Sequence, residues 1–239
     1  MANLSFPNES AAYREARNAL LDAEAALRAQ IEAVAAQRRS LPPGGLVPED
    51  YVFERLGPHG MPEKVRMSEL FGPHDTLILY SFMYGPDREG PCPGCTHLLD
   101  SVEGGARHVG RRASLYVVAK SPLARLVALA RDRGWDHLQF ASTDGNAYDA
   151  DYFGDTSKLS APMRQAFGVP DGQDWDETMF NVFHLKDGEI RHFWGSELSY
   201  APTEPHQHHR SGDLVNALWG LLDMTPEGRG NFFPKLRYD

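Results

Sequence analysis

Leu77-Ile-Leu-Tyr-Ser-Phe-Met83, an apolar run, precedes Cys92-Pro-Gly-Cys95, and together these two segments decide the predicted fold. The run has the length and composition of a buried strand, and a helix is expected from Thr96 onward. The chain of 239 residues contains two cysteines, and both stand in this motif. A strand, a Cys-x-x-Cys and a helix in this order are typical of a redox site.

Redox chemistry at this motif assigns different roles to the two cysteines. Cys92 is expected at the N-terminus of the helix, where backbone N–H groups and the helix dipole stabilise a thiolate and lower its pKa. Pro93 suits the first helical position because it has no N–H that would lose a partner there. Cys95 follows one turn later, close enough to attack a mixed disulfide on Cys92. The sequence therefore predicts Cys92 as the nucleophile and Cys95 as the resolving thiol.

Three other interpretations of the cysteine pair compete with this one. A zinc site needs further ligands, and the only histidine cluster is His206-x-His208-His209, whose spacing matches no zinc-finger pattern. Covalent haem attachment requires a histidine directly after the second cysteine, where Thr96 stands instead. The third interpretation is a pair of reduced thiols without a function. We expect neither a metal nor a bound cofactor.

The composition narrows the classes of function. A hydrophobic fraction of 41% and a charged fraction of 24% are those of a globular protein with a proper core. The net charge of −9 argues against a nucleic-acid or membrane partner, because both need a basic surface. Residues 1–9 lack the basic and apolar regions of a secretory signal, and no apolar run approaches the roughly 18 residues of a membrane helix. We therefore expect a cytoplasmic protein, in which a lone cysteine pair is more often catalytic or metal-binding than structural.

Strand and helix patterns alternate around the motif. Strands are expected over residues 51–55, 113–119 and 137–142, and a strand-turn element over residues 65–71. A helix is expected from Pro122, with Ser121 as its cap, to Gly134. Residues 179–185 and 189–194 read as a hairpin, because Asp187-Gly188 forms its turn. Residues 144–176 are predicted to be a long polar loop. A last helix over residues 213–223 would turn its leucines at 214, 218, 221 and 222 toward the core. The order predicts an α/β protein, a three-layer sandwich around a mixed central sheet.

The N-terminal part of the chain predicts one long helix over residues 9–39, with Asn8 or Ser10 as its cap. Apolar side chains repeat every seven residues from Tyr13 to Val34, which gives a narrow stripe of coiled-coil type. The stripe either lies on the helix's own domain or pairs with a second copy as a homodimer. The linker Leu41-Pro-Pro-Gly-Gly45 ends this region, so residues 1–45 are predicted to be a helical arm and residues 46–239 the main domain.

The order of motifs resembles a thioredoxin-like family of unknown function, domain-of-unknown-function family eight-nine-nine, whose members are labelled predicted dithiol-disulfide oxidoreductases. The resemblance implies a thioredoxin-like fold with an added long N-terminal helix and with the Cys-x-x-Cys at a strand-to-helix corner. It implies a protein or small-molecule disulfide as substrate and an electron donor that the sequence does not identify. The matching segments are 80–87, 92–95, 119–124, 133–135, Ser142 with 146–148, and 222–229.

One departure from ordinary thioredoxins concerns the strand that faces the dithiol. In those proteins a cis-proline begins this strand and binds the substrate backbone. The hairpin alignment places Phe180, preceded by Met179, at that position, and no proline occurs between Asp171 and Pro202. A cis bond without proline costs about 2.5–4 kcal/mol, so we expect a trans bond. Tyr84, Met179 and Phe180 are the predicted substrate-groove residues.

The second departure is the long segment Tyr84–Pro91 before the motif, which makes the corner resemble a peroxiredoxin. Arg88 in this segment is a candidate to stabilise a thiolate, because a nearby guanidinium lowers the pKa of a thiol. The enzymatic alternative is therefore a peroxide reductase with Cys95 as the peroxidatic thiol and Cys92 resolving it. The non-enzymatic alternative is a thioredoxin-fold binding module whose cysteines have ordinary pKa values.

Overall fold

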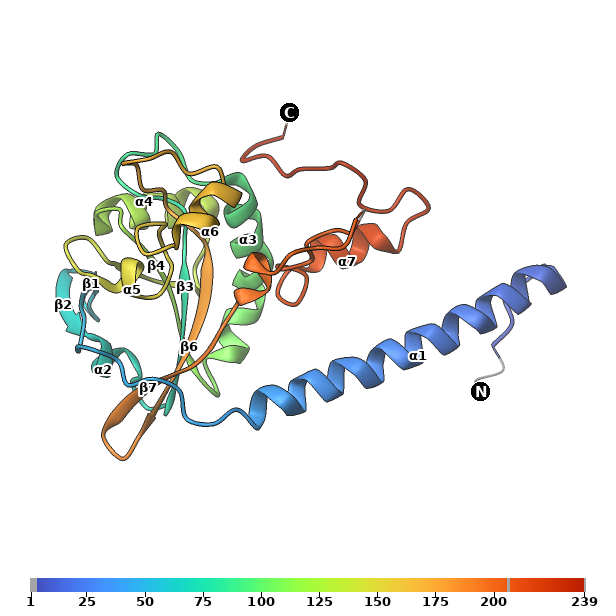
Figure 1. The fold of residues 1–239 in the computed structure, drawn as a ribbon, viewed down its shortest axis with the longest axis horizontal. Helices are drawn as coiled ribbons and strands as arrows, with labels where there is room; N and C mark the ends of the chain where they lie inside the picture. Colours follow the sequence, from blue (N-terminus) through green and yellow to red (C-terminus); the bar gives the residue numbers. More distant parts are fainter. Residues whose placement is uncertain (1–3, 206, 239) are drawn as a thin grey trace. The chain divides into compact units, whose positions relative to one another are not determined.

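A mixed sheet of seven strands forms the centre of the unit that follows Pro43 (Figure 1). The computed structural model describes residues 4–205 and 207–238. Strands β3, β4 and β5 are parallel, β6 and β7 add an antiparallel hairpin beside β3, and β1 and β2 add another beside β5. The strands, in the sheet order β2-β1-β5-β4-β3-β6-β7, are Pro62–Arg66, Val52–Leu56, Gln139–Ser142, Ser114–Ala119, Thr76–Ser81, Met179–Lys186 and Glu189–Gly195.

Helices cover both faces of the sheet. Side chains of α3 and α4 pack on one face with alternate strand residues such as Tyr80, Val117 and Phe140. Side chains of α2 and α5 pack on the other face with the intervening residues, such as Leu79 and Val118. This alternation follows from the two-residue period of a strand, and it gives each face its own apolar core. The helices of this unit are α2 Met67–Leu70, α3 Pro93–Val109, α4 Leu123–Arg133, α5 Tyr148–Asp151, α6 Ala161–Ala166, the 3₁₀ helix Glu197–Tyr200 and α7 Ala217–Asp223.

The N-terminal unit consists of α1, a helix of 29 residues over Ala11–Arg39. Its cap is Ser10, whose hydroxyl accepts a hydrogen bond from the Tyr13 N–H at 3.1 Å. None of the α1 residues is buried, and Leu20 and Leu27 of the predicted stripe are 48% and 60% exposed. Pairing of this helix with a second copy stays a prediction. The chain divides into two compact units after Pro43.

Two predicted helices begin later than their sequence patterns suggest. The Ser121 hydroxyl donates to the Tyr84 carbonyl instead of capping α4, so the helix starts at Leu123 with Pro122 as its N-cap. The last helix does not include residues 213–216, because Asn216 caps it by accepting from the Leu218 N–H at 3.1 Å. The expectation that its leucines all face the core is wrong, since residues 214 and 221 are 59% and 60% exposed. Gly134 ends α4 in the left-handed conformation, as predicted.

The architecture agrees with the predicted fold class. It is a mixed α/β sandwich of three layers with a thioredoxin-like order of elements from β3 to β7 and an added long N-terminal helix. The region 144–176 is mostly irregular, as expected, but contains the short helices α5 and α6. Within the described residues, the structure has no helix that is both long enough and apolar enough to cross a bilayer.

Candidate active site

The dithiol lies at the corner between β3 and α3. Cys92 is the N-cap of α3, with Pro93 as the first helical residue, so the helix begins three residues before Thr96. The Cys92 N–H donates to the Met83 carbonyl at 3.1 Å. The Cys92 carbonyl accepts from the Thr96 N–H and hydroxyl, each at 2.9 Å. The bond to Met83 joins the start of the helix to the segment that follows β3, and together the three bonds fix the backbone of Cys92.

The Cys92 side chain is half-buried, and its pKa is lowered from 9.0 to about 6. The largest cause is the hydrogen bond from the Cys95 side chain, and backbone N–H groups of Cys95 and Gly94 add to it. The positive charge of Arg88 lowers the pKa further, and burial opposes all of these effects. Above pH 6, the group that solvent reaches at this corner is therefore a thiolate.

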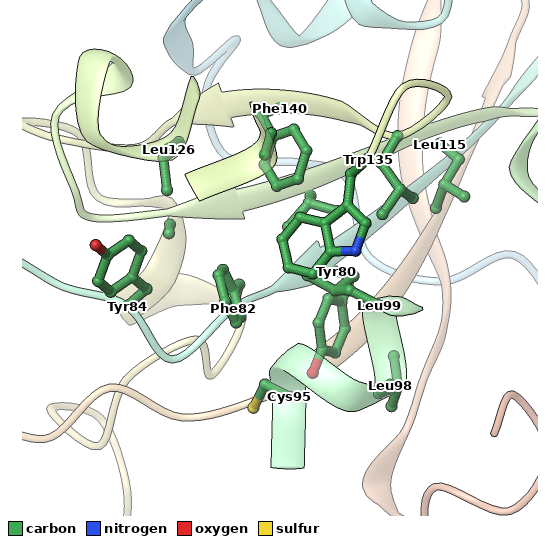
Figure 2. Close-up of a cluster of buried hydrophobic side chains, with 14 of the residues drawn as sticks. Tyr80, Phe82, Tyr84, Cys95, Leu98, Leu99, Leu115, Leu126, Trp135 and Phe140 are labelled. Atoms are coloured by element: carbon green, nitrogen blue, oxygen red, sulfur yellow. The ribbon is translucent and has the colours of Figure 1, made fainter. Parts of the chain in front are cut away.

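Cys95 has the opposite environment. Its side chain is 5% exposed, and the hydrogen bond to Cys92 together with burial raises its pKa well above the ordinary value. Figure 2 shows the Tyr80 hydroxyl pointing toward the turn of α3 that carries Cys95. Both cysteines are free thiols. The pair thus consists of one accessible sulfur that ionises readily and one enclosed sulfur that keeps its proton.

Arg88 lies in the long segment before the motif and is held by an acidic side chain. Its Nε lies 3.4 Å from Asp176 Oδ2. The same Asp176 oxygen accepts the Gly85 N–H at 2.5 Å, so one carboxylate fixes both the loop backbone and the Arg88 side chain. The positive charge of Arg88 is one of the causes that lower the pKa of Cys92, and its role as the residue that stabilises the thiolate stays a prediction.

Arg125 of α4 holds the other side of this loop, and sequence reasoning missed it. Its guanidinium donates to the carbonyls of Gly85 and Glu89, each at 3.0 Å, and to that of Arg88. It also lies 4.1 Å above the centre of the Tyr84 ring. Three carbonyls on one side chain give the loop a fixed shape without regular secondary structure. The sequence gives little sign of this role, because Arg125 stands outside the apolar pattern of its helix.

The predicted groove residues differ in exposure, since two of them are buried and one is half-buried. Tyr84 is 8% exposed and packs beneath Arg125, and Met179 is 3% exposed, with Ser196 Oγ donating to its sulfur at 3.1 Å. Phe180 is half-buried, and its ring centre lies 4.5 Å from that of Tyr80. The structure contains no cis peptide bond among its described residues, so the Met179–Phe180 bond is trans, as expected. Of the three, Phe180 retains the most exposure.

Glu177 is a second group that the sequence did not suggest. It follows Asp176 and precedes β6, whose Met179 pairs with Ser81 at the end of β3. Burial raises the pKa of the Glu177 carboxyl, and the negative charge of Cys92 raises it further, while Arg88 opposes this. The neighbouring Thr178 N–H donates to it at 3.4 Å. Glu177 therefore adds a carboxyl group to the surroundings of the thiol.

A buried polar cluster lies at the carboxyl ends of the parallel strands. Lys120 follows β4 and forms an ion pair with Asp155, and Thr143 follows β5 and donates to Asp149. Asp149 is 2% exposed. Burial raises the pKa of its carboxyl from 3.8 to about 6, although Thr143 and Lys120 oppose the shift. The sequence pattern predicts only a long polar loop around these acidic residues, so it does not predict the cluster.

Asp149 should make the stability of the protein depend on pH. Since its folded pKa of about 6 exceeds 3.8, its contribution is complete below pH 3.8 and is lost as pH rises through 6. From about pH 4 to pH 8, the unfolding free energy of wild type should fall by roughly 2–3 kcal/mol relative to Asp149→Asn. Urea titrations of both proteins at each pH measure this difference. Asp144→Asn, at an exposed position, is the control. If the difference in unfolding free energy between wild type and Asp149→Asn changed with pH no more than the difference for Asp144→Asn, the assignment would be contradicted.

No group of three potential metal ligands is assembled among residues 4–205 and 207–238. His208 and His209 are exposed, and His206 lies outside the described residues.

Sequence comparison gives one family match and no curated relative. The family described as "Bacterial protein of unknown function (DUF899)" matches residues 4–237. None of the curated proteins compared with this chain matches it.

Several solved structures are similar in fold. Peroxidoxin BcpB from Mycobacterium tuberculosis is 17% identical, with a TM-score of 0.43 over 74% of this chain and 95% of its own. Reduced Prx3 from Vibrio vulnificus, in complex with hydrogen peroxide, is 11% identical, with a TM-score of 0.41 over 70% and 91%. A putative electron transfer protein from Aquifex aeolicus is 14% identical, with a TM-score of 0.38 over 74% and 93%. At such identities and scores the similarity carries no information about the reaction.

Proposed function

Because this chain belongs to the DUF899 family of bacterial proteins of unknown function, we propose its activity from the site alone. The protein is a thiol-disulfide oxidoreductase whose Cys92–Cys95 pair cycles between dithiol and disulfide. It acts in a reducing cytoplasm on a protein or small-molecule disulfide and receives electrons from a separate donor. The reaction uses the two sulfurs and needs no bound cofactor.

The observation that carries this proposal is the division of properties between the two thiols. Cys92 is accessible and has a pKa of about 6, so a thiolate is available at neutral pH to attack a disulfide. Cys95 is enclosed and keeps its proton until a mixed disulfide has formed on Cys92. Loss of the Cys92 negative charge at that point removes one cause of the raised Cys95 pKa. Cys95 can then ionise and attack the Cys92 sulfur.

The two alternatives receive less support from the site. A peroxide reductase with Cys95 as the attacking thiol would need a thiolate at a sulfur that is 5% exposed and has a raised pKa. A non-catalytic binding module would leave both thiols with ordinary pKa values, whereas the pKa values of Cys92 and Cys95 shift in opposite directions.

Alkylation by iodoacetamide tests the proposal directly. Between about pH 4 and pH 9, the rate should rise with the thiolate fraction and reach half of its maximum near pH 6, with the label on Cys92. Fragment-ion mass spectrometry of the peptide that contains both cysteines locates the label. A midpoint near the ordinary pKa of a thiol, or a label on Cys95, would sink the proposal.

A pair of arginine variants sharpens this measurement. Arg88→Gln should move the midpoint to higher pH, because it removes a positive charge that favours the Cys92 thiolate. Arg111→Gln changes the net charge equally at an exposed position beyond α3 and should leave the midpoint in place. Equal shifts in both variants would mean that Arg88 acts only through the net charge.

A further inference from the structure

The C-terminal segment brings an exposed aromatic ring beside the dithiol. Gly94 separates the two cysteines, and a Cβ built on it would lie 3.5 Å from Phe233 Cζ and 3.8 Å from Cys92 Sγ. The ring edge and the sulfur therefore lie on the same side of the α3 N-terminus, at most about 7.3 Å apart. Phe233 is 63% exposed, which leaves most of its surface free beside the nucleophile.

The chain on both sides of Phe233 is held by contacts within the unit that follows Pro43. Before it, the buried Arg229 pairs with Asp223 at 2.5 Å and with Asp213 at 2.7 Å. After it, Pro234 is buried, and the Leu236 carbonyl accepts from Arg133 at 2.7 Å. These contacts hold the backbone of the segment, while the Phe233 ring itself stays exposed. An exposed ring on a fixed backbone is suited to contacting a second molecule.

Carboxyl groups also lie in and beside the loop that precedes the motif. Asp87 and Glu89 are exposed in the loop before the motif, and Arg88, the only cation of residues 84–91, is paired with Asp176. Glu177 adds a further carboxyl group whose pKa responds to the charge of Cys92. Because Arg88 and the backbone N–H groups of α3 stabilise the Cys92 thiolate, these carboxyl groups do not by themselves exclude an anionic substrate, and the selection falls to the Phe233 ring.

Building on the proposed oxidoreductase function, we propose that Phe233 selects disulfides with apolar or aromatic groups beside the sulfurs over polar, charged ones. The Cys92 thiolate attacks one substrate sulfur, forming the mixed disulfide as the substrate S–S bond breaks, and the released thiolate takes a proton from water. Cys95 then gives up its proton to water and attacks the Cys92 sulfur. The Cys92–Cys95 disulfide forms as the second substrate thiolate leaves. Two electrons pass to the substrate, and an external dithiol restores the reduced pair.

Two disulfides of opposite character test the selection. The reduced protein is mixed with 2,2′-dithiodipyridine, which is uncharged and aromatic, or with glutathione disulfide, which is anionic. Single-turnover rates need no electron donor. Phe233→Ala should slow the reaction with dithiodipyridine about tenfold and change the reaction with glutathione disulfide less than about twofold. Phe233→Leu should restore most of the lost rate, because it keeps an apolar side chain at the position.

Tyr238→Ala is the matched control, since Tyr238 is a similarly exposed aromatic residue of the same segment, at 65%. It should leave both rates unchanged. Equal slowing of both probes by Phe233→Ala would overturn the selection while leaving the oxidoreductase function intact. If neither probe oxidises the wild-type dithiol, the oxidoreductase function itself fails and the selection fails with it.

Discussion

Replacing Cys92 with serine is expected to abolish reduction of a model disulfide, whereas replacing Cys95 is expected to trap the reaction halfway. A serine hydroxyl does not ionise near neutral pH, so the first attack is lost in Cys92→Ser. In Cys95→Ser the Cys92 sulfur still attacks, but no second thiol displaces the bound substrate. Intact-mass spectrometry should then show one substrate half attached to Cys92.

The same two variants separate the proposed reaction from peroxide reduction. If Cys95 were the peroxidatic thiol, Cys95→Ser would lose peroxide consumption, and Cys92→Ser would retain a single turnover. A protein in which both variants keep full thiol-dependent activity would show that this pair is not the reactive centre.

Gly154→Ala is expected to destabilise the fold by about 2–3 kcal/mol through steric overlap alone. The φ angle of Gly154 lies outside the positive range, so alanine can adopt its backbone conformation. However, a Cβ would overlap Asp149 Oδ1 and lie 2.7 Å from Ser81 Oγ. Both neighbours are at most 2% exposed and have little room to move. The unfolding free energy in urea measures the loss.

Gly104→Ala makes the same chemical change with the opposite expected sign. Gly104 lies in the middle of α3, is exposed, and has no atom within 4 Å of the added Cβ. Alanine should therefore stabilise the protein by up to about 1 kcal/mol, because glycine is a poor helix former. Destabilisation of similar size at both positions would rule out overlap with Asp149 as the cause at Gly154.

The corner that carries the dithiol was predictable because its signals are local. An apolar run, two closely spaced cysteines and a proline at the first helical position are all readable from one short stretch. The structure places Cys92 at the helix N-terminus and Pro93 directly after it, as those signals indicate. The order of the other strands along the chain was predictable in the same way, from their apolar patterns.

The surroundings of the dithiol were less predictable because they depend on tertiary contacts. Arg125 reaches a loop that lies 37 residues earlier in the chain, and neither partner marks the contact in the sequence. In the sequence, Asp149 is an acidic residue of a predicted loop. In the structure it is buried and lies against Gly154. The start of α7 was misplaced because Asn216 caps the helix, and its side chain also contacts His97 of α3, which no helical periodicity reveals.

The exposed character of α1 also determines how the stability of this protein has to be observed. Because α1 has 29 residues and none of them is buried, the helicity of an unpaired α1 should decline gradually on heating. A far-ultraviolet circular dichroism signal therefore mixes this decline with the cooperative unfolding of the sheet. All four tryptophans follow Pro43, at positions 135, 175, 194 and 219. Their fluorescence reports the dithiol-bearing unit by itself, and only that signal yields a two-state free energy for it.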